Sequence, residues 1–413
     1  MTKSDDKRVP ALRFKGFTDE WEQRKLKNIT KRISRKNLNL DSTLPLTISA
    51  QYGLVDQRKF FDKQIASKKL ENYLLLKNGE FAYNKSYSKD YPFGAIKRLN
   101  NYKLGVLSTL YIAFKPVSIN TDYLEEYFDS TKWYKEIYKR ATEGARNHGL
   151  LNISPQDFFE LNLSIPNNRI EQERISKILK LLSLLITLQQ RKLKQLKLLK
   201  KAMLQTLFTN KSVPQLRFKG FTDDWEKDEL GNIGRTQSGV GFPDNEQGGE
   251  KGVPFFKISD MSNTNNEFKM IYSNNYVTKS QIVRKKWKPI TQVPAVIFAK
   301  VGAALMLNRK RLVCVPFLID NNTMAYIFGK KWEPYFGKFL FDTLNLPKFA
   351  QTGALPSFNA SNIETIKILL PQKREQQTIS SFLLKVNDAI LYHQHKLDHL
   401  KKIKQFLLQN MFI

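Results

Sequence analysis

Cysteine is nearly absent from this chain of 413 residues. Its one cysteine, Cys314, excludes an internal disulfide and any zinc site built on several cysteines. The residue lies in the run RLVCVPFLI, whose apolar and β-branched residues are typical of a strand. We therefore expect Cys314 to be a small buried side chain without chemistry of its own.

Long apolar runs and targeting signals are also missing. No stretch of about 18 apolar residues could span a bilayer, and no lipidation motif is present. The first residues, MTKSDDKRVP, lack the apolar core of a signal peptide. These absences predict a cytoplasmic protein without a membrane partner.

Acidic residues are scarce relative to basic ones. The chain has 68 lysines and arginines against 38 aspartates and glutamates, which gives a net charge of +30 and an isoelectric point near 9.9. A surplus of this size favours a polyanionic partner, of which nucleic acid is the simplest. A membrane surface is the alternative, and the missing anchors argue against it.

Motifs that carry catalysis on nucleic acids are missing as well. The sequence has no Asn/Asp-Pro-Pro-Tyr/Phe motif, with which adenine methyltransferases grip a flipped base. It also has no Gly-x-x-x-x-Gly-Lys-Ser/Thr phosphate-binding loop. A self-contained methyltransferase or nuclease is therefore disfavoured, and we expect a protein that is not an enzyme.

One motif occurs twice. VPALRFKGFTDEWE begins at Val9, and VPQLRFKGFTDDWE begins at Val213. Residues 9–29 and 213–233 align at an offset of 204, with 15 of 21 positions identical. Aromatic residues around a glycine are typical of packing anchors at a tight turn. We expect these aromatics to be buried where each following domain meets a helix: Phe14, Phe17 and Trp21, and their counterparts Phe218, Phe221 and Trp225.

A second pair of segments extends the duplication to the end of the chain. IPNNRIEQERISKIL begins at Ile165 and LPQKREQQTISSFL begins at Leu370, and after one gap they align at the same offset of 204. Identical pairs follow along both segments, from Glu171/Glu375 to Phe208/Phe412. The chain therefore has the order A–B–A′–B′, in which each A is a domain and each B is a helix.

Each B segment has the pattern of a long helix. It follows a proline, carries glutamate near its start, and then runs for about 40 residues without glycine or proline. Apolar residues recur every three to four positions, which predicts a seam between two helices. A helix about 60 Å long cannot bury such a stripe alone, so we expect the two helices to pack together. The seam positions include Leu193, Leu196, Leu397 and Leu400.

Three histidines in HQHKLDHL are the best candidate metal ligands. His395 and His399 lie one turn apart on one helical face. The first copy of the segment has Arg191 and Gln195 at these positions. Because the duplicated helix does not need a metal, we expect no metal site here.

The A segments, roughly 30–165 and 234–370, have mixed α/β patterns and little sequence in common. GVLSTLYIAF and MAYIF are rich in β-branched and aromatic residues, which is typical of strands. Two short correspondences remain: GEFAYNKS with PAVIFAKV, and EEYF from Glu125 with EPYF from Glu333. We infer a common scaffold with different surfaces, as in two domains that bind different targets.

Together these features resemble the specificity subunit of type I restriction–modification systems. The resemblance rests on LRFKGFTDEWE and LRFKGFTDDWE, on the EQER and EQQT helix starts, and on the A–B–A′–B′ order, and it covers essentially the whole chain. It implies an α+β fold with a pseudo-twofold internal duplication, in which two mixed α/β target recognition domains are joined by two long antiparallel coiled-coil helices. The implied segments are a first recognition domain with its anchor at 1–165, a spacer helix at 166–210, a second domain with its anchor at 211–370, and a spacer helix at 371–413.

The resemblance also implies partners. Each recognition domain would read one half of a bipartite double-stranded DNA target, while the helices would set the spacing and hold two methyltransferase subunits. Restriction (translocase) subunits would complete the complex. S-adenosylmethionine, ATP and Mg²⁺ would bind to those partners, so we expect no cofactor on this chain. One alternative stays open: a regulator that reads a bipartite site without enzyme partners.

Residues that could contact DNA gather in short segments of the A units. In the first unit, YNKSYSKDYPFGAIKR interleaves aromatic and basic residues, and TEGARNHG sets polar residues beside two glycines. In the second unit, NRKR groups three basic residues, and two further lysines follow strand-like runs. Such side chains suit phosphates and base edges. The candidates are Asn84, Lys85, Tyr87, Lys89, Arg98, Arg146, Asn147, His148, Lys257, Lys300, Arg309, Lys310 and Arg311.

Overall fold

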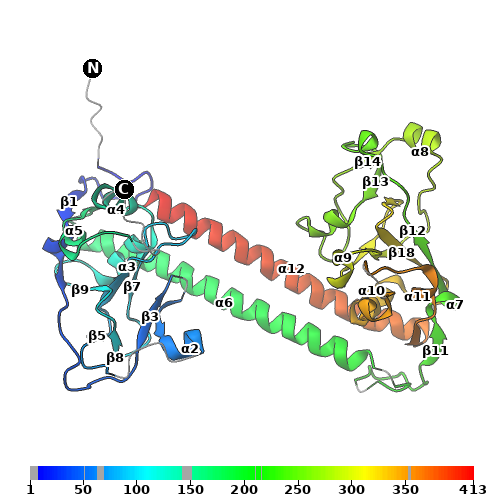
Figure 1. Ribbon diagram of the computed structural model, residues 1–413, viewed down its shortest axis with the longest axis horizontal. Helices are drawn as coiled ribbons and strands as arrows, with labels where there is room; N and C mark the ends of the chain where they lie inside the picture. Colours follow the sequence, from blue (N-terminus) through cyan, green and yellow to red (C-terminus); the bar gives the residue numbers. More distant parts are fainter. Residues whose placement is uncertain are drawn as a thin grey trace. The chain divides into compact units, whose positions relative to one another are not determined.

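The computed structural model describes residues 8–50, 52–62, 69–141, 151–209, 211–214, 216–351 and 355–413. The chain divides into two compact units: unit 1 comprises residues 1–190 and 395–413, and unit 2 comprises residues 191–394 (Figure 1). Each unit contains a sheet-rich α/β domain, the first half of one long helix and the last half of the other. The predicted class, two mixed α/β domains with two long helices, is confirmed.

The two long helices are α6 (Arg169–Leu207) and α12 (Lys373–Asn410). The start of α6 is capped by Asn168, whose side-chain oxygen accepts a hydrogen bond from the Ile170 amide at 2.9 Å. A glutamate lies in the first turn of each helix, where the helix dipole favours negative charge. No residue inside either helix is glycine or proline, so nothing interrupts the backbone hydrogen bonds.

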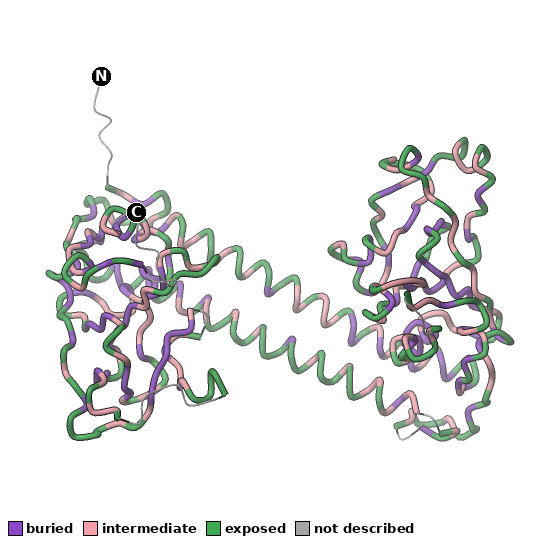
Figure 2. Tube along the Cα trace, in the orientation of Figure 1, coloured by how far each residue is buried: buried purple, intermediate pink, exposed green. Residues whose placement is uncertain are grey.

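The seam positions lie on the less exposed side of the helices. Leu193 is 6% exposed and Leu397 is 4% exposed, while Leu196 and Leu400 are half-buried. Figure 2 shows exposed and half-buried residues alternating along both helices, with the buried residues gathered mainly inside each sheet-rich part. This pattern is that of helices with one apolar face.

The domain of unit 1 is built on an antiparallel four-stranded sheet in the order β2-β9-β6-β7. Two-stranded pairs β1-β10, β3-β4 and β5-β8 flank it. The strands are β1 (Glu22–Lys25), β2 (Thr30–Arg32), β3 (Leu46–Ser49), β4 (Gly53–Asp56), β5 (Leu74–Lys77), β6 (Phe81–Asn84), β7 (Ala95–Arg98), β8 (Leu104–Leu107), β9 (Ile112–Pro116) and β10 (Asn162–Ile165). The shorter helices are α1 (Leu26–Ile29), α2 (Gln57–Phe61), α3 (Thr121–Asp129), α4 (Tyr134–Arg140) and α5 (Pro155–Phe159).

The domain of unit 2 has a four-stranded sheet in the order β12-β18-β15-β16, a three-stranded sheet β14-β13-β17 and the pair β11-β19. Its strands are β11 (Glu226–Glu229), β12 (Gly234–Ser238), β13 (Val253–Phe256), β14 (Tyr276–Val277), β15 (Ala295–Ala299), β16 (Lys310–Val313), β17 (Leu318–Ile319), β18 (Thr323–Phe328) and β19 (Lys367–Leu370). Its shorter helices are α7 (Leu230–Ile233), α8 (Lys279–Lys285), α9 (Ala303–Met306), α10 (Pro334–Thr343) and α11 (Ala360–Glu364), with 3-10 turns at Asp244–Glu246, Ile258–Ser262 and Leu346–Phe349.

The main sheets of the two units have the same plan. In each sheet, the strand that follows the first short helix (β2 or β12) lies at one edge. The two positions at the other side of the sheet form a hairpin (β6-β7 or β15-β16), whose first strand is central and whose second strand forms the opposite edge. The segment GEFAYNKS contains β6 and PAVIFAKV contains β15, and these two strands hold the same place in their sheets. The inferred common scaffold is confirmed for the sheets.

The second sequence correspondence, EEYF with EPYF, is wrong in register. Asn120 caps α3 and Glu333 caps α10, each by accepting a hydrogen bond from the amide three residues later. The two helices are therefore equivalent when Asn120 is aligned with Glu333, at an offset of 213 residues. The alignment of EEYF with EPYF has an offset of 208. The short motif misled because both helices carry Tyr-Phe in their first two turns.

Cys314 is also placed differently from the prediction. β16 ends at Val313, and Cys314 follows it as an exposed residue. No helix among the described residues is long and apolar enough to cross a membrane.

Candidate functional site

The repeated motif is tied to the start of a long helix by an arginine–glutamate pair. In unit 1, Arg13 donates to both carboxylate oxygens of Glu171, at 2.7 and 2.9 Å. In unit 2, Arg217 donates to both oxygens of Glu375, at 2.9 and 2.8 Å. Each pair spans 158 residues of sequence, so the duplication repeats the contact as well as the motif.

Both pairs are charge-assisted, and in each the glutamate is buried while the arginine is half-buried. Glu171 is 1% exposed and Glu375 is 2% exposed. The hydrogen bond to Glu171 raises the pKa of Arg13, and that to Glu375 raises the pKa of Arg217. Because a buried carboxylate without its partner is costly, each pair holds the motif on its helix. Sequence analysis missed Arg13 and Arg217, although identical arginines and glutamates in both copies were a signal.

The tryptophans of the motif are buried as predicted from the repeat, and the phenylalanines are not. Trp21 is 1% exposed and Trp225 is 3% exposed. Phe14, Phe17, Phe218 and Phe221 are half-buried, and of these Phe14 and Phe218 pack against the hydrophobic cores of their units. Gly16 and Gly220 share a φ of 93°, which favours glycine and allows the tight turn of the motif.

A glutamine next to each paired glutamate joins the long helix to the domain. Gln172 accepts from the Asn120 amide at 2.9 Å and donates to the Pro166 carbonyl at 2.8 Å. Gln376 accepts from the Glu333 amide at 2.8 Å and donates to the Pro371 carbonyl at 2.8 Å. The first turn of α6 therefore fixes the start of α3, and the first turn of α12 fixes the start of α10.

Four of the DNA-contact candidates of unit 1 lie on the connection between β6 and β7. Asn84 ends β6, and its side chain accepts from the Ser86 amide at 3.0 Å, which turns the chain away from the sheet. Lys85 is half-buried. Tyr87 and Lys89 are exposed, so an aromatic ring and a cation project from this connection. The second predicted cluster, Arg146, Asn147 and His148, lies outside the described residues.

Arg98 does not fit a DNA contact, in contrast to the prediction. Its side chain is 11% exposed and forms ion pairs at 2.6 Å with Asp122 and with Glu125. Both carboxylates belong to α3, against which β7 packs. The arginine is therefore committed to holding α3 on the sheet.

In unit 2, two candidates bracket the connection between β15 and β16. Lys300 follows β15 and is half-buried, and its backbone amide donates to the Asn322 carbonyl at 2.7 Å. Arg309 precedes β16 and is exposed, with a contact to Ser262 Oγ at 2.8 Å. This connection corresponds to β6–β7 of unit 1, because β15 and β6 hold the same sheet position. Lys257 lies apart from it, after β13, and donates to Gln247 at 3.0 Å.

Lys310 and Arg311 turn inward, which removes them from the candidates. Lys310 is 2% exposed, its ammonium donates to the Leu344 carbonyl at 2.6 Å, and burial lowers its pKa to about 8. Arg311 is half-buried and donates to the carbonyls of Lys310 and Met261. Burial lowers the pKa of Arg311 as well. Strand β16 begins at Lys310, so the second half of the run NRKR lies in the sheet and the Lys310 side chain is buried in the domain.

Metal ligands do not gather in the part of the chain that the structure describes: it holds no group of three or more His, Cys, Asp and Glu side chains suited to an ion.

Residues 222–402 match the family described as the type I restriction modification DNA specificity domain. A curated relative from Methanocaldococcus jannaschii, the MjaX specificity subunit of a type I restriction enzyme, is 26% identical over 299 residues. Residues 222–402 of this chain therefore form a type I DNA specificity domain. The resemblance drawn from the repeated motif is thereby confirmed. The match spans 69% of this chain and 65% of that specificity subunit, which is less than two thirds of its length.

Solved structures of specificity subunits have the same fold. The type I restriction–modification S subunit from M. genitalium is 14% identical, with a TM-score of 0.60, and the alignment covers 98% of this chain and 99% of that one. A chain from a structure of complex assembly and conformational transition of the type I restriction–modification system is 13% identical, with a TM-score of 0.53, and the alignment covers 95% and 97%. Because both alignments cover at least 95% of this chain, these solved structures extend the fold assignment to both units.

Proposed function

We propose that this chain is the sequence-specific DNA-recognition subunit of a type I restriction–modification complex. The observation that carries the proposal is the duplication with divergence: both units share one sheet plan and one buried anchor, while their exposed connections differ. Two copies of one scaffold with different exposed side chains suit a bipartite target, one half for each domain. The long helices would set the spacing between the halves.

The corresponding connections β6–β7 and β15–β16 are the proposed DNA-contacting elements. They carry Tyr87 and Lys89 in unit 1 and Lys300 and Arg309 in unit 2. Lysine and arginine neutralise phosphates, and an exposed tyrosine or asparagine can contact base edges or sugars. The net charge of +30 adds long-range attraction for DNA. The alternative, a regulator without enzyme partners, has no observation that favours it.

We propose that α6 also carries a docking surface for a methyltransferase subunit. Ile178, Leu181, Leu185 and Leu188 follow one another at spacings of three and four residues and are 38–53% exposed. Such spacing places them on one face. Exposed leucines in a row are unusual on a helix that needs no further partner. The positions 204 residues later on α12 are Phe382, Lys385, Ala389 and Tyr392, so the row of aliphatic residues is not repeated there.

Catalysis would belong to the partners. S-adenosylmethionine would bind to the methyltransferase subunits, and ATP with Mg²⁺ would bind to the restriction subunits. This division of roles follows from the proposed subunit role. It leaves to this chain only the recognition of the DNA sequence. Purified by itself, the chain should not incorporate a labelled methyl group into DNA.

Substitution of the exposed cations should test the proposed DNA interface. We expect Lys89→Gln and Arg309→Gln each to weaken DNA binding and to lower the slope of log affinity against log salt by about one, because one phosphate contact is lost. Lys227→Gln is the matched control, since Lys227 is an exposed lysine on β11, in a different sheet. The measurement is fluorescence anisotropy with duplex DNA over a salt series. Equal slopes for Lys89→Gln, Arg309→Gln, the control and the unsubstituted chain would remove these connections from the interface.

Substitution of the exposed leucines should test the docking surface. We expect Leu181→Ser with Leu185→Ser to leave the thermal unfolding of the chain within about 2 °C, because exposed positions contribute little to stability. The affinity for the methyltransferase subunit should fall at least about tenfold, as for interface positions that lose apolar contact. Leu110→Ser is the control, because Leu110 is 74% exposed and lies off the helix. Scanning calorimetry of the chain measures its unfolding temperature, and titration calorimetry with the purified methyltransferase measures the affinity. An unchanged affinity would exclude this face as the docking surface.

A further inference from the structure

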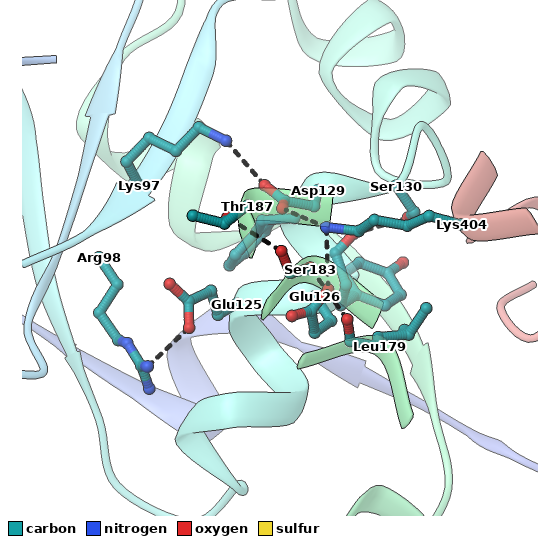
Figure 3. Close-up of polar contacts among 12 residues, drawn as sticks. Lys97, Arg98, Glu125, Glu126, Asp129, Ser130, Leu179, Ser183, Thr187 and Lys404 are labelled. Atoms are coloured by element: carbon teal, nitrogen blue, oxygen red, sulfur yellow. Dashed lines mark hydrogen bonds and ion pairs between the residues drawn. The ribbon is translucent and has the colours of Figure 1, made fainter. Parts of the chain in front are cut away.

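A lysine near the end of α12 reaches into the domain of unit 1. Lys404 lies 3.6 Å from Glu126 and 3.5 Å from Asp129, both on α3. Asp129 also accepts from Lys97 of β7 at 2.7 Å. Figure 3 shows Lys404 and Lys97 approaching Asp129 from opposite sides. Through these contacts α12 is linked to α3 and to the strand that follows the β6–β7 connection.

Glu126 is the unusual member of this group. It is 4% exposed, and its Oε2 has no hydrogen-bond partner although Lys404 is within ion-pair distance. Burial raises the pKa of Glu126 to about 7, which Lys404 partly offsets. Asp129 differs: burial acts to raise its pKa, but Lys97 and Lys404 lower it overall, so it stays ionised. The charge that changes near neutral pH is therefore on Glu126.

Strand β7 and helix α6 also contribute polar or charged groups near Glu126 (Figure 3). β7 contributes Lys97 and also Arg98, which pairs with Glu125 of α3. α6 contributes the hydroxyls of Ser183 and Thr187, which donate to carbonyls of their own helix (Figure 3). A cavity of about 380 Å³ is lined by Lys97, Asp129 and Lys404 among others, but not by Glu126. The cavity gives water access to Asp129 and Lys404, the charged groups next to Glu126.

Unit 2 contains the corresponding lysine with different neighbours. Lys200 is 204 residues before Lys404. Counted from the capping residues, Glu126 is six positions after Asn120, and the residue six positions after Glu333 is Phe339. Lys200 lies 5.5 Å from the centre of the Phe339 ring and donates to Asn387 at 2.8 Å. The second joint therefore has a phenyl ring where the first has a carboxyl group.

We propose that Lys404, Glu126 and Asp129 form a protonation-sensitive joint between α12 and the first α/β domain, and that the second domain has no such acid-dependent joint. Lys404 is a positioning residue, because it acts on the β6–β7 connection through Asp129 and Lys97. The assignment stands on contacts within unit 1 and does not depend on the proposed function.

The direction of the effect follows from the raised pKa of Glu126. A carboxyl group with a folded-state value of about 7 and an unfolded value near 4.5 stabilises the folded joint when it is neutral, and this contribution is lost as pH rises to about 7 and beyond. Between pH 6 and pH 8.5, the equilibrium for closing the joint should fall about tenfold. At pH 8.5 Lys404 compensates the charge, so its removal should matter more there than at pH 6.

Hydrogen exchange of the whole chain tests the joint. We expect protection of residues 121–129 and 400–410, corrected for intrinsic exchange, to fall about tenfold from pH 6 to pH 8.5, and that of 334–343 not to fall. Glu126→Gln should abolish the fall, and Lys404→Met should enlarge it. Lys200→Met is the matched control and should leave unit 1 unchanged.

Two results would overturn the proposal. Glu126→Gln with the wild-type pH response would show that another group titrates. Lys404→Met with equal effects at both pH values would show a structural contact without dependence on protonation. Glu126→Gln preserves the shape of the side chain, so this test does not require that the Lys404 variant fold.

Discussion

Replacing Arg217 with methionine should destabilise unit 2 by about 3–5 kcal/mol, the range found when one partner of a buried ion pair is removed. The substitution leaves the Glu375 carboxylate, 2% exposed, without its two hydrogen bonds from the guanidinium. It also removes the hydrogen bond to the Asp223 carbonyl, which closes the repeated motif on itself. Urea unfolding of the purified chain, followed by the fluorescence of its tryptophans, measures the loss.

The double variant Arg217→Met with Glu375→Gln separates the charge from the packing. Because the glutamine carries no charge to bury, we expect the double variant to recover much of the stability lost in the single one. An additive double variant would mean that the arginine acts through packing of its stem. A stability loss below about 1 kcal/mol for Arg217→Met would contradict the anchoring role altogether.

Unit 1 offers a comparison with the same pair. Glu171 accepts a further hydrogen bond from the Trp21 indole at 3.3 Å, whereas the Trp225 indole has no partner among the described residues. Arg13→Met therefore leaves Glu171 with one donor and should cost less than Arg217→Met. Comparing the stability losses of the two variants tests whether each pair stabilises its unit through the hydrogen bonds to the buried carboxylate.

Features set by local pattern could be predicted from the sequence. The duplication, the long helices after Pro166 and Pro371, and the buried Trp21 and Trp225 follow from spacing, helix-breaking residues and side-chain size. The common sheet plan followed from one short correspondence, because strands of one scaffold keep their apolar residues. These inferences need no knowledge of which segments meet.

Features set by long-range contact could not be predicted. Arg13 and Glu171 are 158 residues apart, and their repetition as Arg217 and Glu375 marks these residues without indicating that they pair. Arg98 and Lys310 are residue types that usually lie on the surface. In the structure Arg98 pairs with a carboxylate of α3, and Lys310 is buried inside unit 2. The capping residues set the register of α3 and α10, and the shared Tyr-Phe pair concealed it.

The largest functional effect should come from exchanging the domain core of unit 2. Residues 234–366 lie between α7 and β19, so their replacement by the same segment of another family member keeps β11, β19 and the Arg217–Glu375 pair. The donor should carry an aromatic residue in the place of Phe336, which packs against Phe208 and Trp225. Since each domain is proposed to read alone, one half of the target should change completely.

The matched exchange in unit 1 replaces residues 30–161, between α1 and β10. This exchange keeps β1, β10 and the Arg13–Glu171 pair. It should change the opposite half of the target and leave the half read by unit 2 intact. Neither exchange alters α6 or α12, so the number of bases between the two halves should stay constant.

The most direct test is the methylated motif of the unit 2 exchange, mapped across the genome of cells that express the variant with its methyltransferase partner. The proposed function predicts a bipartite motif with one half and the spacer unchanged and the other half taken from the donor. A motif that changes in both halves, or one that stays the same in both, would contradict separate recognition by the two domains.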